Sequence, residues 1–231
     1  MSFVDALLWA VRSAVESLAL IQNGNPSAMA VATRVEPITD AVHLSIDMQN
    51  IFAPGGVWET PWMERVLPLI VEITAHHAAR TVFTRFITPV HAGDRPGRWR
   101  GYFQKWHRAT RIELPASELE LVPALRRFAP PAEIIDKPAY SAFYQSPLAS
   151  FLSKKGVCTL VITGAETDVC VLATILDAVD LGFRVVIVED ALCSSSDAGH
   201  DALMTLYRTR YSEQIELIKA AQLPELWLEA A

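Results

Sequence analysis

Cysteine is scarce in this chain, which holds three in 231 residues and has no Cys-x-x-Cys spacing. Because an odd and scattered set does not suit a disulfide framework, we expect reduced thiols and a cytoplasmic protein. The chain also lacks GxGxxG and GxxxxGK, the common phosphate-binding loops, so no nucleotide cofactor is predicted. Lys and Arg number 20 against 26 Asp and Glu, and the net charge of −6 disfavours nucleic acid as a partner.

No apolar run is both long and uncharged enough to indicate a membrane span. Residues 3–21 come nearest, but Asp5, Arg12 and Glu16 interrupt them and no basic segment precedes them. We therefore expect an amphipathic helix followed by a loose connector, without membrane association. This divides the chain into residues 1–36, the helix and connector, and residues 37–231, a single α/β domain.

Short β-branched runs alternate with helical patterns along the second part of the chain. The runs, predicted as strands, are residues 42–46, 81–87, 133–136, 159–163, 185–188 and 215–218. The helical patterns are residues 66–80, 117–128, 169–181 and 196–207. Because several strands are continuously apolar, the pattern predicts a parallel sheet covered by helices on both faces.

Three reactive side chains follow predicted strands, at the edge where ligands gather in open α/β sheets. Asp47 follows the first strand, Lys137 the third, and Cys170 opens the helix after the fourth. A helix entrance favours thiolate, a carboxylate can accept the thiol proton, and an ammonium stabilises both anions. Pro138 keeps Lys137 extended, and the backbone N–H groups of Glu166 and Cys170 are candidates for an oxyanion hole.

Each of these residues also has a purely structural interpretation. Free cysteine often packs as a small buried hydrophobe, so Cys170 need not be reactive. Asp47 could cap the structure after its strand, and Lys137 could be a solvated surface charge. Their joint placement favours acyl transfer, in which the thiol attacks an amide-like carbonyl.

Four segments of the chain resemble motifs of the isochorismatase-like cysteine hydrolase superfamily. This family includes nicotinamidases, N-carbamoylsarcosine amidohydrolases, ureidoacrylate amidohydrolases and biuret hydrolases. The similar segments are residues 46–56 (IDMQNIFAPGG), 136–143 (DKPAYSAF), 163–171 (TGAETDVCV) and 188–191 (VEDA). The resemblance extends over about residues 40–220 and leaves the N-terminal helix outside.

The resemblance implies an Asp47–Lys137–Cys170 triad without a cofactor. It also implies a three-layer αβα sandwich around a six-stranded parallel sheet of order 3-2-1-4-5-6. A cis peptide typical of the family is expected between Ala165 and Glu166.

Departures from the family pattern narrow the expected reaction. Nicotinamidases of this family hold a metal with an Asp-x-His pair and a further His after the first strand. Here no His occurs between Asp47 and His76, which disfavours a nicotinamidase and a metal. Isochorismatases that cleave a vinyl ether lack the cysteine, so Cys170 favours hydrolysis of a C–N bond.

Aromatic and basic residues interleave in residues 95–111, a segment that we expect to form a lid or a subunit contact. Arg85 is a candidate for pairing with an anionic substrate group, because guanidinium binds carboxylate bidentately. The candidate walls of the substrate site are Phe52, Tyr140, Phe143, Trp99 and Trp106.

Ser194, Ser196, Asp197 and His200 superficially resemble a serine hydrolase triad. Ser and Asp are strong N-caps, so we expect the start of a helix there.

The sequence therefore predicts a cofactor-independent cysteine amidohydrolase acting on a small amide, carbamoyl or ureido compound, assembled as a homodimer or homotetramer. Two alternatives stay open: a vinyl ether hydrolase of the isochorismatase type, and a non-catalytic interaction protein on the same fold.

Overall fold

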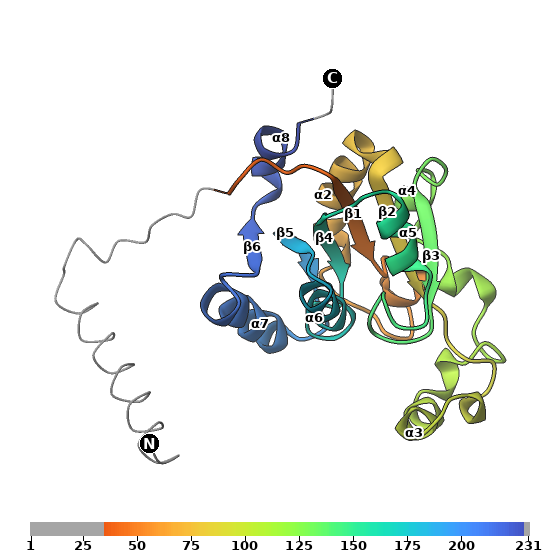
Figure 1. Ribbon diagram of the computed structural model, residues 1–231. Helices are drawn as coiled ribbons and strands as arrows, with labels where there is room; N and C mark the ends of the chain where they lie inside the picture. The colour runs from red at the N-terminus through yellow and green to blue at the C-terminus, as the bar shows by residue number, and fades with distance from the viewer. Residues whose placement is uncertain (1–34, 229–231) are drawn as a thin grey trace, which may run out of the picture. The chain divides into compact units, whose positions relative to one another are not determined.

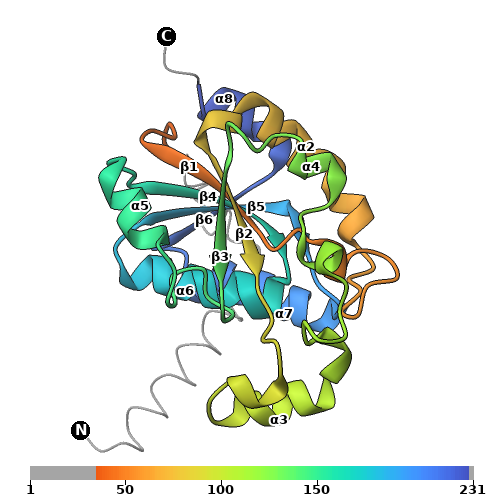
Figure 2. The same ribbon diagram turned by 90° about the vertical axis from the view of Figure 1, so that its right-hand side faces the viewer.

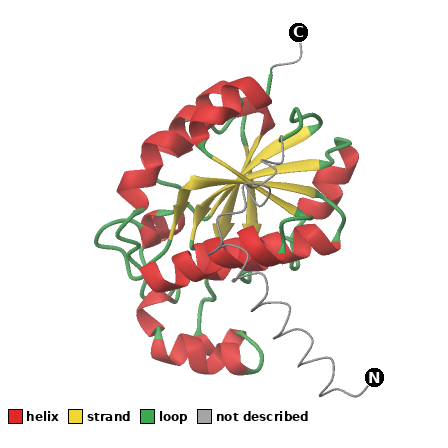
Figure 3. Cartoon of the chain, turned by 90° about the vertical axis from the view of Figure 1, so that its left-hand side faces the viewer, coloured by secondary structure: helices red, strands yellow, loops and turns green. Residues whose placement is uncertain are grey.

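A six-stranded parallel sheet forms the centre of the computed structural model, which describes residues 35–228. The strand order is β3-β2-β1-β4-β5-β6, which confirms the predicted 3-2-1-4-5-6 topology. The strands are β1 (Ala41–Ile46), β2 (Thr81–Phe86), β3 (Glu133–Lys137), β4 (Thr159–Ala165), β5 (Arg184–Cys193) and β6 (Ile215–Ile218). Every residue of β1 and β4 is buried, as expected for central strands that helices cover on both faces (Figure 3).

Helices form a layer on each face of the sheet, which confirms the predicted sandwich (Figure 2). One layer contains α2 (Met63–His76), α4 (Pro123–Arg126) and α8 (Leu223–Leu226). The other contains α5 (Leu148–Lys154), α6 (Leu172–Asp180) and α7 (Asp197–Arg210). The remaining helix, α3 (Arg98–Lys105), lies beyond the carboxyl ends of the strands (Figure 1). None of the helices among the described residues is long and apolar enough to cross a membrane.

Shorter helical turns connect these elements. They are η2 (Asn50–Phe52), η3 (Ala78–Arg80), η4 (Ala92–Asp94), η5 (His107–Ala109), η6 (Ala116–Leu119), the π-helical turn η7 (Thr167–Val171) and η8 (Ala220–Gln222).

Three element predictions differ from the structure. The helix predicted over residues 117–128 is instead the short turn η6 and the single-turn α4, separated by an extended Val122. Pro123 explains the break, because proline disfavours helical backbone at the residue before it. β5 continues five residues past the predicted end, and α3, α5 and α8 were not predicted at all. The helix predicted over residues 3–21 lies outside the described residues, so the division at residue 36 stays a prediction.

Candidate active site

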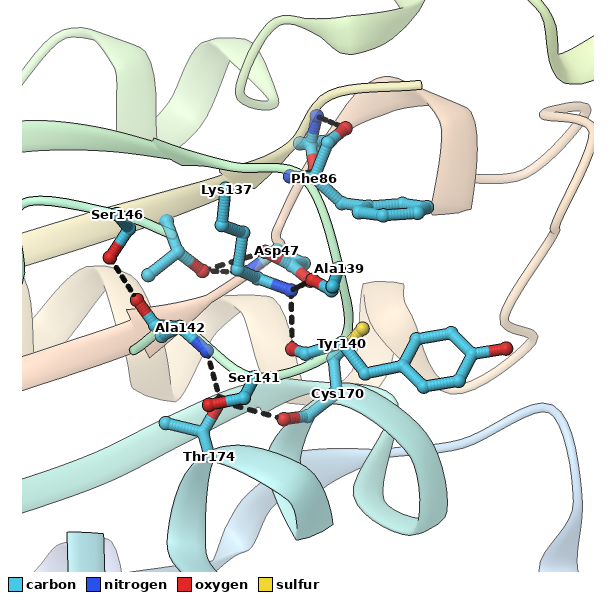
Figure 4. Close-up of polar contacts among 12 residues, drawn as sticks. Asp47, Phe86, Lys137, Ala139, Tyr140, Ser141, Ala142, Ser146, Cys170 and Thr174 are labelled. Atoms are coloured by element: carbon cyan, nitrogen blue, oxygen red, sulfur yellow. Dashed lines mark hydrogen bonds and ion pairs between the residues drawn. The ribbon is translucent and has the colours of Figure 1, made fainter. Parts of the chain in front are cut away.

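The structure brings Asp47, Lys137 and Cys170 together at the carboxyl ends of β1, β3 and β4 (Figure 4). Lys137 Nζ lies 2.7 Å from Asp47 Oδ2, and neither side chain has any solvent exposure. Lys137 Nζ also donates to the carbonyl oxygens of Ala139 at 3.0 Å and Tyr140 at 2.6 Å. The ion pair and the two hydrogen bonds to carbonyl oxygens together fix the position of the ammonium group.

Thr84, on β2, holds the carboxylate from the side opposite Lys137. Its hydroxyl donates to Asp47 Oδ1 at 2.6 Å and accepts from the Asp47 backbone N–H at 3.1 Å. Asp47 has φ +50°, in the left-handed region that few residues other than glycine adopt. The backbone turn and the Thr84 hydroxyl together direct the carboxylate at Lys137.

The thiol of Cys170 is buried at the turn between β4 and α6. Burial raises its pKa well above the ordinary value; the Lys137 ammonium lowers this pKa and the Asp47 carboxylate raises it, but burial is the largest cause. The thiol is therefore protonated in the resting site. The direction of this pKa is opposite to the one expected from the helix entrance, because burial favours the neutral thiol.

Lys137 remains charged although it is buried. Burial by itself lowers its pKa, but the Asp47 carboxylate raises it above the ordinary value. The resting site thus combines an ammonium, a carboxylate and a neutral thiol.

The turn that holds Cys170 depends on close contact between β1 and β4. Gly164 has φ +115°, and a Cβ atom there would lie 2.1 Å from the carbonyl oxygen of Ile46. No other residue fits this position. The peptide bond between Ala165 and Glu166 is cis, and Cys170 lies in the turn η7 that follows.

A cavity of about 550 Å³ opens next to Cys170. Its apolar walls are Phe52, Trp58, Phe86, Tyr102, Trp106 and Tyr140. Its polar lining includes Glu59, Glu166, Cys170 and Ser195. Another cavity, of about 340 Å³ between α2 and α8, contains none of the triad residues. The larger cavity is therefore the one in which a substrate can reach the thiol.

The structure brings some of the predicted wall residues to this cavity and not others. Phe52, Tyr140 and Trp106 line it. Trp99 packs against Tyr140 with ring centroids 4.8 Å apart but does not line the cavity. Phe143 stacks on Phe183 beside the core, with centroids 5.8 Å apart.

Arg85 lies away from the cavity. Its guanidinium pairs with Asp136 and Glu120, each at 2.7 Å. Side chains alternate along a strand, so Arg85 points opposite to Thr84 and Phe86, which face the site.

Several site residues were missed in the sequence. Thr84 and Phe86 were detectable in principle, because they alternate on the inner face of β2. Trp58 and the side chain of Glu166 carried no such signal, because loops position them.

The cluster at residues 194–200 begins a helix, as predicted. Ser196 accepts a hydrogen bond from the Gly199 N–H at 3.0 Å and caps α7. Ser194 donates to Asp168 Oδ1 at 2.6 Å, and His200 Nδ1 bonds Thr167 Oγ1 at 2.9 Å. Neither Ser194 nor Ser196 is therefore bonded to the histidine as a nucleophile requires. Among residues 35–228, no three His, Cys, Asp or Glu side chains are grouped so that they could hold a metal ion.

Comparison with known proteins places this chain in a family. A family model described as the isochorismatase domain matches residues 41–219. The chain belongs to the isochorismatase family. The match spans all six strands and includes Asp47, Lys137 and Cys170.

Relatives within the family have different names. A ureidoacrylate amidohydrolase of Methylorubrum extorquens is 29% identical over 78% of this chain and 81% of its own length. A protein of Arabidopsis thaliana named as a probable inactive nicotinamidase is 30% identical over 69% of this chain and 83% of its own length. A cysteine hydrolase structure from Pseudomonas syringae pv. phaseolicola shares the fold, with a TM-score of 0.69, 24% identity and coverage of 82% of this chain and 93% of that one. The family thus includes amidohydrolases.

Proposed function

We propose that this family member hydrolyses a C–N bond in a small amide, carbamoyl or ureido compound through a thioester on Cys170. The observation that carries the proposal is the fully buried Asp47–Lys137 pair beside a thiol that lines an aromatic cavity. Amidohydrolases among the relatives support the same reaction class.

In the first half of the reaction, Asp47 accepts the proton of the Cys170 thiol and the sulfur attacks the substrate carbonyl. The backbone N–H groups of Glu166 and Cys170 are the proposed donors to the carbonyl oxygen as it becomes an oxyanion. The tetrahedral intermediate collapses, the C–N bond breaks, and Asp47 returns its proton to the leaving nitrogen.

In the second half, water attacks the thioester. Asp47 takes a proton from this water, the acid is released, and the same proton returns to the Cys170 sulfur. Lys137 stays protonated throughout and pairs with whichever of its two neighbours carries the negative charge. Neither half of the cycle requires an external cofactor.

The proposal is tested with an ammonia-release screen of amide, carbamoyl and ureido compounds. Cys170→Ala should lose at least about 1000-fold in kcat, because the covalent route is then closed. Cys158→Ala, which changes an exposed thiol outside the cavity, is the matched control and should keep full activity. Mass spectrometry of quenched wild-type enzyme should detect an acyl group on the peptide that contains Cys170. Full activity in Cys170→Ala excludes the thioester mechanism.

A further inference from the structure

The charge of the cavity wall is negative. Two carboxylates, Glu59 and Glu166, belong to its lining, and no Lys, Arg or His does among the described residues. Two cations near the site already have partners. Lys137 is ion-paired with Asp47 and donates to two carbonyl oxygens, and Arg85 is bound to Asp136 and Glu120 outside the cavity.

Glu166 is held in place by one of its two carboxylate oxygens. The Ser195 N–H donates to Oε1 at 3.2 Å, and the Thr60 hydroxyl lies 3.4 Å from the same atom. Within residues 35–228, Oε2 has no hydrogen-bond or ion-pair partner. This leaves a fixed carboxylate oxygen free to bind a group that enters the cavity.

Aromatic rings surround the same space. Trp58 lies at the centre of the cluster, with ring centroids 5.8 Å from Phe52, 5.9 Å from Phe86, 6.0 Å from Tyr102 and 6.2 Å from Trp106. The negative faces of such rings attract cations and repel anions. A carboxylate among aromatic rings is a combination that recognises ammonium and guanidinium groups.

We propose that the substrate of this enzyme is a cationic amide, whose ammonium, quaternary ammonium or guanidinium group is bound by Glu166 and the aromatic wall while its carbonyl lies at Cys170. This rests on the proposed amidohydrolase function for the role of the carbonyl. The charge selectivity itself depends only on the cavity. Among residues 35–228, the lining offers no Lys, Arg or His side chain with which an anionic substrate group could pair.

Charged thiol reagents measure this selectivity without a known substrate. The probes are 2-(trimethylammonium)ethyl methanethiosulfonate and 2-sulfonatoethyl methanethiosulfonate, which differ mainly in charge. Modification of Cys170 is followed by mass spectrometry, and each rate is divided by that of the same reagent with N-acetylcysteinamide. We expect the cationic reagent to be favoured at Cys170 by about five- to tenfold, the range of a partly buried cation bound by rings and a carboxylate.

Glu166→Gln is the decisive variant, because glutamine keeps an oxygen for Ser195 and Thr60 and loses only the charge. It should lower the preference for the cation by about fivefold. Any change in the general reactivity of the thiol cancels in the ratio of the two reagents. Glu225→Gln removes an exposed carboxylate on α8 outside the cavity and should leave the ratio unchanged.

A second measurement uses a neutral reagent. Choline should slow the modification of Cys170 by methyl methanethiosulfonate more than its uncharged isostere 3,3-dimethylbutan-1-ol does, and the difference should disappear in Glu166→Gln. Equal protection by the two alcohols, or equal rates with the two charged reagents, overturns the cation site.

The outcomes separate this inference from the proposed function. Hydrolysis of amides without any charge preference refutes the cation site alone. A preference that depends on Glu166, without hydrolysis of any amide in a panel that includes cationic ones, supports the cation site and refutes the amidohydrolase.

Discussion

Breaking the buried Asp47–Lys137 pair should destabilise the fold far more than removing both charges together. Neither side chain is exposed, and the two charged atoms lie 2.7 Å apart. Removing one partner of such a pair costs about 3–5 kcal/mol, whereas replacing both is close to neutral. For a chain of this size that corresponds to a fall in Tm of about 6–20 °C for each single variant. The double variant Asp47→Asn/Lys137→Met should melt above either single variant, and below the wild type because the carbonyl oxygens of Ala139 and Tyr140 lose their donor.

The same reasoning predicts the direction in which the stability of Asp47→Asn changes with pH. Without the carboxylate, burial lowers the pKa of Lys137 below its ordinary 10.5, while the unfolded chain keeps the ordinary value. Between these two pKa values the unfolded chain binds more protons, so stability relative to the wild type rises with pH by up to about 1.4 kcal/mol per unit. The loss of unfolding free energy in Asp47→Asn, relative to the wild type, should therefore be largest at low pH and should shrink as the pH approaches 10.5.

Calorimetric and urea unfolding of the four proteins, from pH 6 to 9, measures both effects. Asn at position 47 keeps an oxygen for the Thr84 hydroxyl, so the double variant loses charge without losing that hydrogen bond. Additive effects of the two substitutions would refute the buried pair as a coupled unit. If the loss of stability in Asp47→Asn grows with pH instead, Lys137 is not the group that titrates.

Three further predictions concern neighbouring residues. Gly164→Ala should fail to fold or lose at least about 3 kcal/mol of unfolding free energy by urea titration, because backbone strain combines with a 2.1 Å contact between the new Cβ and the Ile46 carbonyl oxygen. The control Gly101→Ala, on the exposed face of α3, should be neutral or stabilising. Thr84→Val should lower kcat at least about tenfold and Thr84→Ser should largely restore it, because only the hydroxyl orients Asp47; equal kcat in both variants would contradict this. Burial raises the pKa of Cys193 above the ordinary 9.0 that the unfolded chain retains. The contribution of this thiol to stability is therefore fully present below pH 9 and is lost as the pH rises above 9. In Cys193→Ala the Tm should fall less steeply above pH 9 than in the wild type.

The sequence predicted the parts of the site that depend on strand ends. Asp47 and Lys137 follow β1 and β3, and the topology of a parallel sheet carries both to one edge. Arg85 shows the limit of this reasoning. It was considered for its charge, but alternation along β2 turns it to the face where Asp136 and Glu120 lie.

Residues placed by loops could not be predicted. Trp58 reaches the cavity through a turn after η2, which has no periodic signal in the sequence. The cis peptide before Glu166 was expected from the family resemblance alone, and the place of the Glu166 side chain in the cavity was not expected. The state of Cys170 also needed the structure. A helix entrance suggests thiolate, but the degree of burial that reverses this depends on tertiary packing.

The raised pKa of the Cys170 thiol is compatible with its proposed role as nucleophile. That pKa measures the loss of a proton to water, which leaves an additional charge in a buried site. In the proposed mechanism the proton moves instead to Asp47, so an ammonium, a carboxylate and a thiol become an ammonium, a carboxylic acid and a thiolate. The net charge is the same before and after, and Lys137 faces an anion in both states. In this mechanism the buried ion pair therefore lets a desolvated thiol react without any change in the net charge of the site.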